Sequence, residues 1–201
     1  MMTRSAMRAA GLCGLAATLL LSGCANRPAV PMSSAFESQG GSHWPASAHL
    51  REGSYVAGAC HIRLAGIQDL RTDPQVMGDI GGRMIHATDT VGWVRSGLEG
   101  LKQDPRIRLD DQASTDASDL VLDVDLVKAY VLSITTEKTA NVVLRVRYSR
   151  AGASAGEKVY RGVDLGANWV SGADETQSTF DRALTQLLEE LDTDVIAHCA
   201  A

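Results

Sequence analysis

Two long stretches of alternating apolar and polar residues constrain the fold of this chain more than any other feature. In residues 120–132 the first even-numbered positions are Leu or Val, whereas Asp123 and Asp125 fall on the opposite side. Residues 141–148 repeat the pattern, with an apolar residue at every even position. Because successive side chains of a strand point to opposite faces, both stretches predict strands with one buried face and one solvent-facing side.

The end of the chain predicts a long amphipathic helix. Ser171 or Asp174 can cap its start, because a side-chain oxygen there accepts a hydrogen bond from an unpaired backbone N–H group. Asp174 and Glu175 also favour the positive end of the helix dipole. The predicted apolar stripe consists of Phe180, Leu184, Leu187, Leu188, Leu191 and Val195.

A second, shorter helix is predicted over residues 91–101. Asp89 or Thr90 can cap its start, and Asp104-Pro105 ends it, because proline disfavours helical backbone in the residue before it. Shorter strands are predicted at residues 61–67, 83–87, 106–109 and 159–169, with a glycine-rich turn at 78–82 and a hairpin loop at 151–156. These elements favour an α+β fold, a two-layer sandwich with a mostly antiparallel sheet of four to five strands and two helices on one face.

The first 24 residues have the layout of an export signal. Arg4 and Arg8 precede an uncharged apolar stretch, residues 11–21, that is too short for a permanent membrane-spanning helix. The segment ends in Leu21-Ser22-Gly23-Cys24, which resembles the lipobox of bacterial lipoproteins. The alternative is an ordinary cleaved signal peptide with a chance cysteine.

The lipobox resemblance implies that Cys24 becomes the first residue of the mature protein. Its thiol would carry a diacylglyceryl group and its amine a further acyl chain, such as palmitate, so that the mature protein is held stably at a membrane. By the sorting rule of these lipoproteins, Ala25 implies the outer membrane, with the protein facing the periplasm. We therefore predict a signal peptide over residues 1–23.

Composition sets the remaining domain boundaries and excludes some partners. Residues 24–56 are rich in Gly, Pro and Ser and lack an apolar period, which predicts a lipidated N-terminus followed by a flexible tether. The folded domain is then expected over residues 57–201. The chain of 201 residues has a formal net charge of −5, which argues against nucleic acid as a partner.

Two cysteines remain after processing, Cys60 and Cys199. Each stands next to a histidine, His61 and His198, so that four zinc ligands are conceivable. However, neighbouring residues of a strand point to opposite faces, and exported thiols meet oxidising conditions. We therefore favour a disulfide between Cys60 and Cys199 over a metal site.

Asp123 and Asp125 are the paired carboxylates with the best spacing for acid and base catalysis. Arg145 and Arg147 have the same spacing on the next predicted strand, so antiparallel pairing would place the opposite charges side by side on the solvent face. We favour this ion-paired interpretation. The sequence contains no nucleophile elbow, no phosphate-binding loop and no metalloprotease motif. We therefore expect neither an enzyme nor a cofactor.

Short motifs along most of residues 57–198 resemble the YajG-like group of bacterial lipoproteins and, more distantly, auxiliary lipoproteins of envelope ABC-type transport systems. The matching positions are Asp69-Leu70-Arg71, Gly78, Trp93-Val94, Leu98, Tyr160-Arg161, Leu187-Leu188 and Leu191-Asp192-Thr193-Asp194. The first resemblance implies an envelope lipoprotein without a defined reaction. The second implies a module that assists lipid or solute transport.

The sequence thus predicts an outer-membrane-anchored lipoprotein that acts as a non-enzymatic interaction or structural module of the cell envelope. Its expected contacts are the membrane, through the lipid at Cys24, and an envelope protein. The alternative function is that of an auxiliary lipoprotein for lipid or solute transport, with an apolar cleft between helices and sheet.

Overall fold

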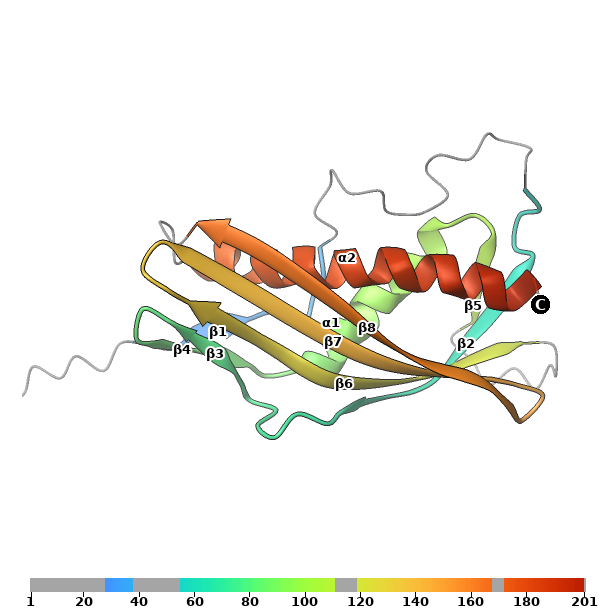
Figure 1. The fold of residues 1–201 in the computed structure, drawn as a ribbon, viewed down its shortest axis with the longest axis horizontal. Helices are drawn as coiled ribbons and strands as arrows, with labels where there is room; N and C mark the ends of the chain where they lie inside the picture. The colour runs from blue at the N-terminus through green and yellow to red at the C-terminus, as the bar shows by residue number, and fades with distance from the viewer. Residues whose placement is uncertain (1–27, 38–54, 111–118, 168–171, 201) are drawn as a thin grey trace, which may run out of the picture.

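The computed structural model describes residues 28–37, 55–110, 119–167 and 172–200. Along the chain these form β1 (Val30–Met32), β2 (Cys60–Asp69), β3 (Val76–Ile80), β4 (Arg83–Ala87), α1 (Thr90–Glu99), a 3-10 turn (Gly100–Gln103), β5 (Ile107–Asp110), β6 (Leu120–Ser133), β7 (Glu137–Arg150), β8 (Ala153–Ala167) and α2 (Ala173–Ala200). In the described part of the chain, eight strands form one mixed sheet with two helices packed on it (Figure 1). The prediction of a mostly antiparallel sheet of four to five strands is therefore wrong.

β6 lies in the middle of the sheet. On one side it pairs antiparallel with β7, which pairs antiparallel with β8. On the other side the first half of β6 runs parallel to β2, and its end meets β3 where Gly78 lies opposite Val131. On its other edge β2 pairs in parallel with β5. β3 pairs antiparallel with β4, and β4 pairs in parallel with β1. The sheet therefore divides beside β6 into two branches.

The parallel pairs explain why the sequence prediction of the sheet failed. Between β2 and β6 the chain passes through β3, β4, α1 and β5 before it returns in the same direction. Alternation within a strand indicates which side chains are buried, but not which neighbour the strand pairs with or in which direction. The direction is set by the crossover, which is a property of the tertiary structure.

The glycine-rich segment predicted as a turn contains a strand. The prediction holds for Gly81 and Gly82, which have positive φ angles between β3 and β4. Gly78, by contrast, lies within β3 with a φ of 110°, and a Cβ there would lie 2.5 Å from the carbonyl oxygen of Val131. Glycine therefore permits both the backbone conformation and the close approach of β3 to β6.

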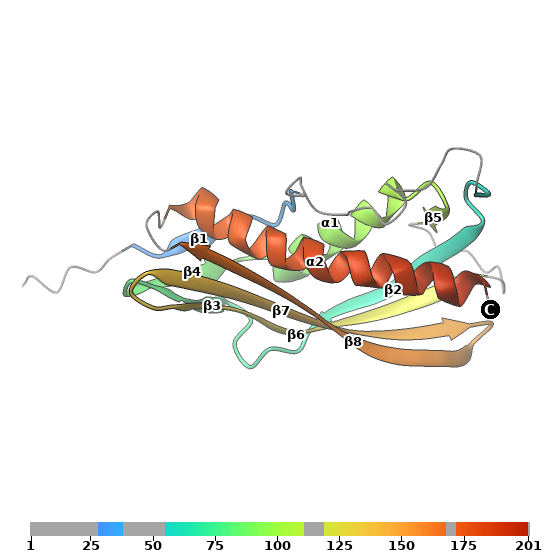
Figure 2. The ribbon, with the colours of Figure 1, turned by 45° about the horizontal axis from the view of Figure 1, so that its top comes forward.

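Both helices cover the same face of the sheet (Figure 2). The apolar stripe predicted for α2 is buried in full: Phe180, Leu184, Leu187, Leu188, Leu191 and Val195. Gly162 of β8 lies against the backbone of Ala183, where any side chain would overlap the carbonyl oxygen. α1 is capped by Asp89, whose Oδ1 accepts a hydrogen bond of 2.6 Å from the N–H of Gly92. This confirms one of the two predicted caps.

Part of the predicted tether belongs to the folded structure. Val30–Met32 is β1, which pairs in parallel with β4, and the side chains of Val30 and Met32 are buried in the core. For the described residues 28–37, the prediction of a flexible tether is therefore wrong. The strand is short and contains Pro31, so it lacks the longer alternation by which strands are recognised in a sequence.

Candidate functional site

The sheet face without helices is the broadest candidate surface. We call it the open face; it lies on the side of the sheet opposite α1 and α2 in Figure 2. It is defined by the side chains of β6, β7 and β8 that point away from the helices. In one cross-strand row Asp125, Arg145 and Val159 lie side by side, and in another Leu132, Thr139 and Leu165 do so. The open face is therefore charged toward one end and apolar toward the other.

The charged part is an ion-paired cluster centred on Arg147. Its guanidinium donates to Asp123 Oδ2 at 2.7 Å and to Asp125 Oδ2 at 2.6 Å, while Arg145 lies 3.9 Å from Asp125. Hydrogen bonds to Asp125 and Asp123 raise the pKa of Arg147. The predicted charge pairing across the two strands is confirmed, and both carboxylates of the hydrolytic alternative are held by a guanidinium.

The connection after β2 is held by a buried arginine. Arg71 forms an ion pair of 2.7 Å with Asp69 and also donates to the hydroxyl of Thr90 and to three backbone carbonyls, those of Pro74, Val76 and Ala129. Burial alone would raise the pKa of Asp69, but the hydrogen bonds from Arg71 and Thr90 lower it. Arg71 also lines an open hollow of about 580 Å³, together with Tyr130 and Met84.

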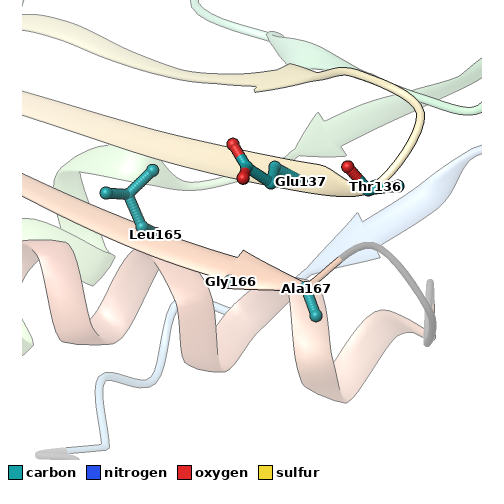
Figure 3. Close-up of a pocket in the computed structure, with 5 residues that line it drawn as sticks. All are labelled: Thr136, Glu137, Leu165, Gly166 and Ala167. Carbon is teal, nitrogen blue, oxygen red and sulfur yellow. The ribbon is translucent and has the colours of Figure 1, made fainter.

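The apolar part of the open face lies at the β6–β7 hairpin. We call Leu132, Ile134 and Leu165 the apolar tip; their exposed fractions are 59%, 64% and 70%. Beside Leu165 a hollow of about 380 Å³ opens between the hairpin and the end of β8 (Figure 3). Leu165 points away from α2 in this view. The tip is therefore an exposed apolar patch rather than part of the core.

Residues 28–37, which we call the N-terminal segment, are docked on the helices. Ser33 donates its N–H to Gln177, whose amide donates back to the carbonyl of Ala35. Further along, the N–H of Phe36 donates to Ser96 Oγ at 3.2 Å, and that of Glu37 to Asp181 at 3.5 Å. The segment is thus fastened to β4, α1 and α2 together.

Asp181 lies buried beneath this segment. Its Oδ1 accepts hydrogen bonds from Trp93 Nε1 at 2.8 Å and from Gln177 at 3.0 Å. Burial raises the pKa of Asp181 to about 6, and the nearby charge of Glu37 contributes in the same direction, although the hydrogen bonds oppose the shift. Asp181 thereby links the two helices to the N-terminal segment.

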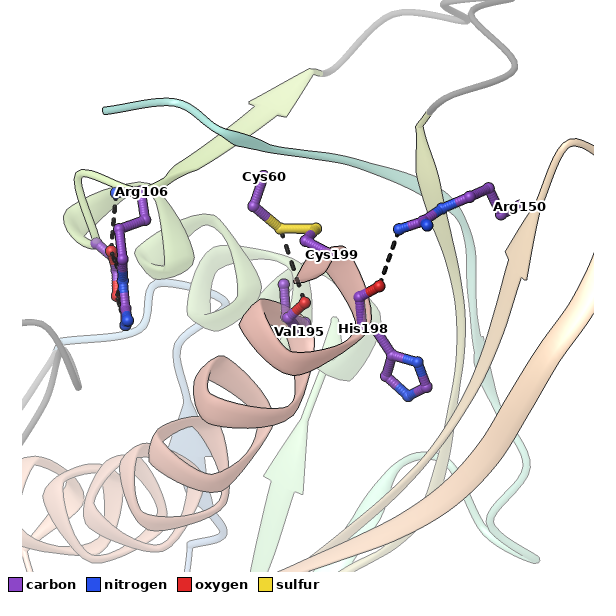
Figure 4. Close-up of a disulfide and its surroundings, with 7 residues drawn as sticks. Cys60, Arg106, Arg150, Val195, His198 and Cys199 are labelled. Atoms are coloured by element: carbon purple, nitrogen blue, oxygen red, sulfur yellow. Dashed lines mark hydrogen bonds and ion pairs between the residues drawn. A yellow bond between two sulfur atoms is a disulfide. The ribbon is translucent and has the colours of Figure 1, made fainter. Parts of the chain in front are cut away.

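The opposite end of the molecule is closed by a disulfide. Cys60 of β2 and Cys199 of α2 are joined, with their Cα atoms 5.4 Å apart (Figure 4). Both sulfurs are therefore unavailable as zinc ligands, and His198 instead stacks on Tyr148. Within the described ranges no group of three or more His, Cys, Asp or Glu side chains could hold a metal ion. A mostly apolar hollow of about 230 Å³ lies beside the disulfide.

A polar cluster joins β7 and β8 to α2 near this end. Tyr160 donates to Asp194 Oδ2 at 2.7 Å, and the hydroxyl groups of Tyr148 and Tyr160 are hydrogen-bonded to each other. Lys158 completes the cluster with an ion pair of 2.6 Å to Asp194. Burial raises the pKa of Tyr148 to about 12. The sequence did not predict this cluster, because β7 and β8 come together with Asp194 of α2 only in the tertiary structure.

The docking of the N-terminal segment and the apolar tip were likewise not predicted from the sequence. The available signal for the tip was the apolar pair Leu132 and Ile134 at the end of a strand. Cys24 and the signal peptide over residues 1–23 lie outside the described residues. Of the two helices that the structure describes, neither has the length and apolar character needed to cross a bilayer.

No known family matches the sequence, and no curated protein does. Among solved structures, the fold is similar to protein XCC0632 of Xanthomonas campestris, of the family DUF330, with a TM-score of 0.53 at 10% identity over 73% of this chain and 89% of that chain. A minor lipoprotein of Acinetobacter baumannii has a TM-score of 0.42 at 12% identity, covering 66% and 92% of the two chains. Lipoprotein GNA1162 of Neisseria meningitidis has a TM-score of 0.37 at 10% identity, covering 69% and 99%. The likeness to the Xanthomonas protein shows a shared fold, whereas the YajG-like resemblance stays a prediction.

Proposed function

We propose that this protein is a lipoprotein of the outer membrane, anchored through Cys24, that acts as a non-enzymatic interaction module on the periplasmic side. In this proposal residues 1–23 are removed and the acylated cysteine becomes the new N-terminus. Two or more acyl chains suffice for stable attachment. An envelope protein is the proposed partner.

The observation that carries the proposal is the docking of the N-terminal segment. The segment begins only four residues after Cys24, and within it Val30 and Met32 are buried in the core. An anchor at Cys24 would therefore hold the domain at the membrane by a short connection, and not at the end of a long spacer. Such a placement presents the open face to partners close to the membrane surface.

The anchor is tested by fractionation of cells that express the full chain. Cys24→Ala is expected in the soluble fraction, because the acylated thiol is absent. The matched control is Cys13→Ala, which alters a cysteine within the predicted signal peptide and is expected to stay with the membrane. Mass measurement of the mature N-terminus reports acylation directly. Retention of the Cys24→Ala protein in the membrane fraction would refute the anchor.

The partner surface is tested by photo-crosslinking in intact cells. A photoreactive residue at Val159, an exposed position on the open face, is expected to capture a reproducible protein partner. The matched control places the same residue at Ala197, which is exposed on α2. Equal or absent protein adducts at the two positions would count against the open face as the interaction site.

A second candidate function is that of an auxiliary lipoprotein for lipid or solute transport. The apolar hollow beside the disulfide favours it, since Val56, Ala59 and Ile196 line a space that could hold part of an acyl chain. Native mass spectrometry of the Cys24→Ala protein purified from cells would show a bound lipid. A consistently empty protein would argue against this function.

A further inference from the structure

We propose that the apolar tip, Leu132, Ile134 and Leu165, inserts into the boundary between headgroups and acyl chains of the membrane that holds the lipid anchor. The proposal rests on the proposed function, because it requires an acylated Cys24. It adds to that function a defined orientation, with the hairpin end toward the bilayer and the disulfide end away from it.

Strand pairing places the tip at the same end of the molecule as the start of the N-terminal segment. β1 runs parallel to β4, and Arg83 at the start of β4 donates to the carbonyl of Pro28 at 3.2 Å. β4 follows the turn after β3, and β3 runs parallel to the end of β6. The end of β8 lies beside the start of β7, where Ala167 pairs with Glu137. Figure 1 shows all these strand ends at one end of the molecule.

The covalent chain limits how far this end can be from the anchor. Four residue steps separate Cys24 from Pro28. An extended chain covers at most about 3.6 Å per residue, so the two residues lie within about 14 Å of each other in any conformation. Acyl chains on Cys24 therefore bring the hairpin end, rather than the distant disulfide end, next to the bilayer.

The composition of the tip suits this boundary. Leu132 and Leu165 lie in one cross-strand row, two strand spacings or about 10 Å apart, and Ile134 follows at the turn of the same hairpin. Of the two nearest charged residues, Lys138 is directed away, in an ion pair of 3.0 Å with Glu175 of α2. Glu137, by contrast, is exposed beside the hollow that Leu165 lines and would lie at the level of the hydrated headgroups. Thr139 lies between Leu132 and Leu165 in this row, so the tip is a group of exposed apolar side chains at one end of the sheet. Exposed apolar side chains that gather in one region mark a surface that contacts a protein or a membrane, and an acidic chain gains its membrane contact from apolar rather than basic side chains.

The tip is tested with a photoreactive residue at position 134 in the full, acylated chain in intact cells. The tip would lie within reach of acyl chains, so phospholipid adducts at position 134 are expected to exceed those at position 159 several-fold. Val159 is the matched control because it is a similarly exposed apolar residue on β8, 57% against 64%, but lies away from the tip. A second variant with the photoreactive residue at Leu165 should behave like position 134.

Three results would overturn the proposal. Adducts with a second copy of this chain would make the tip a self-association surface, and adducts with another protein would make it a protein-docking site. Equal lipid labelling at positions 134 and 159, including none at either, would place the tip in water. Mass measurement of the N-terminus in the same sample separates these results from a failure of the anchor, since loss of acylation at Cys24 would refute the proposed function itself.

Discussion

Single residues decide how the helices and the N-terminal segment hold together. Asp181 is the clearest case, because one buried carboxylate accepts hydrogen bonds from Trp93 of α1, from Gln177 of α2 and from the backbone of Glu37. Burial raises the pKa of Asp181, and the hydrogen bonds from these donors oppose that rise without cancelling it, so that the pKa is raised to about 6. The carboxyl group is therefore expected to change charge near pH 6 in the folded protein.

Asp181→Asn should change the pH dependence of stability. In the folded protein Asp181 keeps its proton up to about pH 6, whereas the ordinary value is 3.8. Between these values the folded state binds more protons than the unfolded state, so the contribution of Asp181 to stability falls as the pH rises from about 4 to about 6. The variant lacks this loss, and its free energy of unfolding should gain on the order of 2 kcal/mol relative to the unsubstituted protein between pH 4 and pH 7.

Urea unfolding of the unacylated protein at several pH values measures this effect. Asp174→Asn is the matched control, because Asp174 is an exposed carboxylate at the start of the same helix. A difference between Asp181→Asn and the unsubstituted protein that stays constant from pH 4 to pH 7 would show that Asp181 does not titrate in this range.

Elements are joined by side chains that bridge neighbouring strands. Arg147 of β7 spans two carboxylates of β6, and one of them, Asp125, has a nearly inaccessible side chain. The predicted pairing of opposite charges across the two strands is observed, and the register places Asp123 opposite Arg147 and Asp125 opposite Arg145. The ion pairing between these two strands could be predicted from the sequence because β6 and β7 follow each other along the chain and consecutive strands pair antiparallel.

Arg147→Met should lower the thermal midpoint of unfolding more than Arg145→Met does. Removal of Arg147 leaves the inaccessible carboxylate of Asp125 without its short ion pair, whereas Arg145 contributes a contact of 3.9 Å. In the background of Asp125→Asn, the effect of Arg147→Met should become smaller, since the buried charge is absent. Calorimetry of the four variants checks this, and strictly additive effects would contradict the coupling.

On the scale of the whole molecule, two connections join segments far apart in the sequence. The N-terminal segment closes one end, and the disulfide between Cys60 and Cys199 ties the first long strand to the last helical turn, across a separation of 139 residues. The start of the N-terminal segment and the disulfide therefore mark opposite ends of an elongated molecule (Figure 1).

Replacement of both cysteines by serine should destabilise the domain without unfolding its core. A cross-link that closes so long a loop lowers the entropy of the unfolded chain and stabilises the fold by about 4–5 kcal/mol in the loop-closure account. Chemical unfolding of the unacylated protein, with and without reductant, measures the difference. Reductant should leave the Cys60→Ser, Cys199→Ser protein unchanged. Free thiols at both positions in the unreduced protein would refute the cross-link.

The sequence by itself determined the features that arise from local spacing. Period-two alternation predicted β6 and β7, a stripe at helical spacing predicted α2, and Asp89 was one of two predicted caps for α1. The ion pairs of Arg147 followed from matched spacing on consecutive strands. In each case the signal depends on residues that are close in sequence, where backbone geometry fixes which side chains share a face.

Only the tertiary structure decided the features that depend on distant segments. The parallel pairs of β2, the pairing of β3 with the end of β6 and the docking of β1 join segments that are far apart in the sequence. The apolar tip likewise consists of residues from two separate strands, brought into one row by antiparallel pairing. These arrangements form because together they bury the shared apolar core. The area buried depends on the whole chain, so it cannot be inferred from the residues of one short segment.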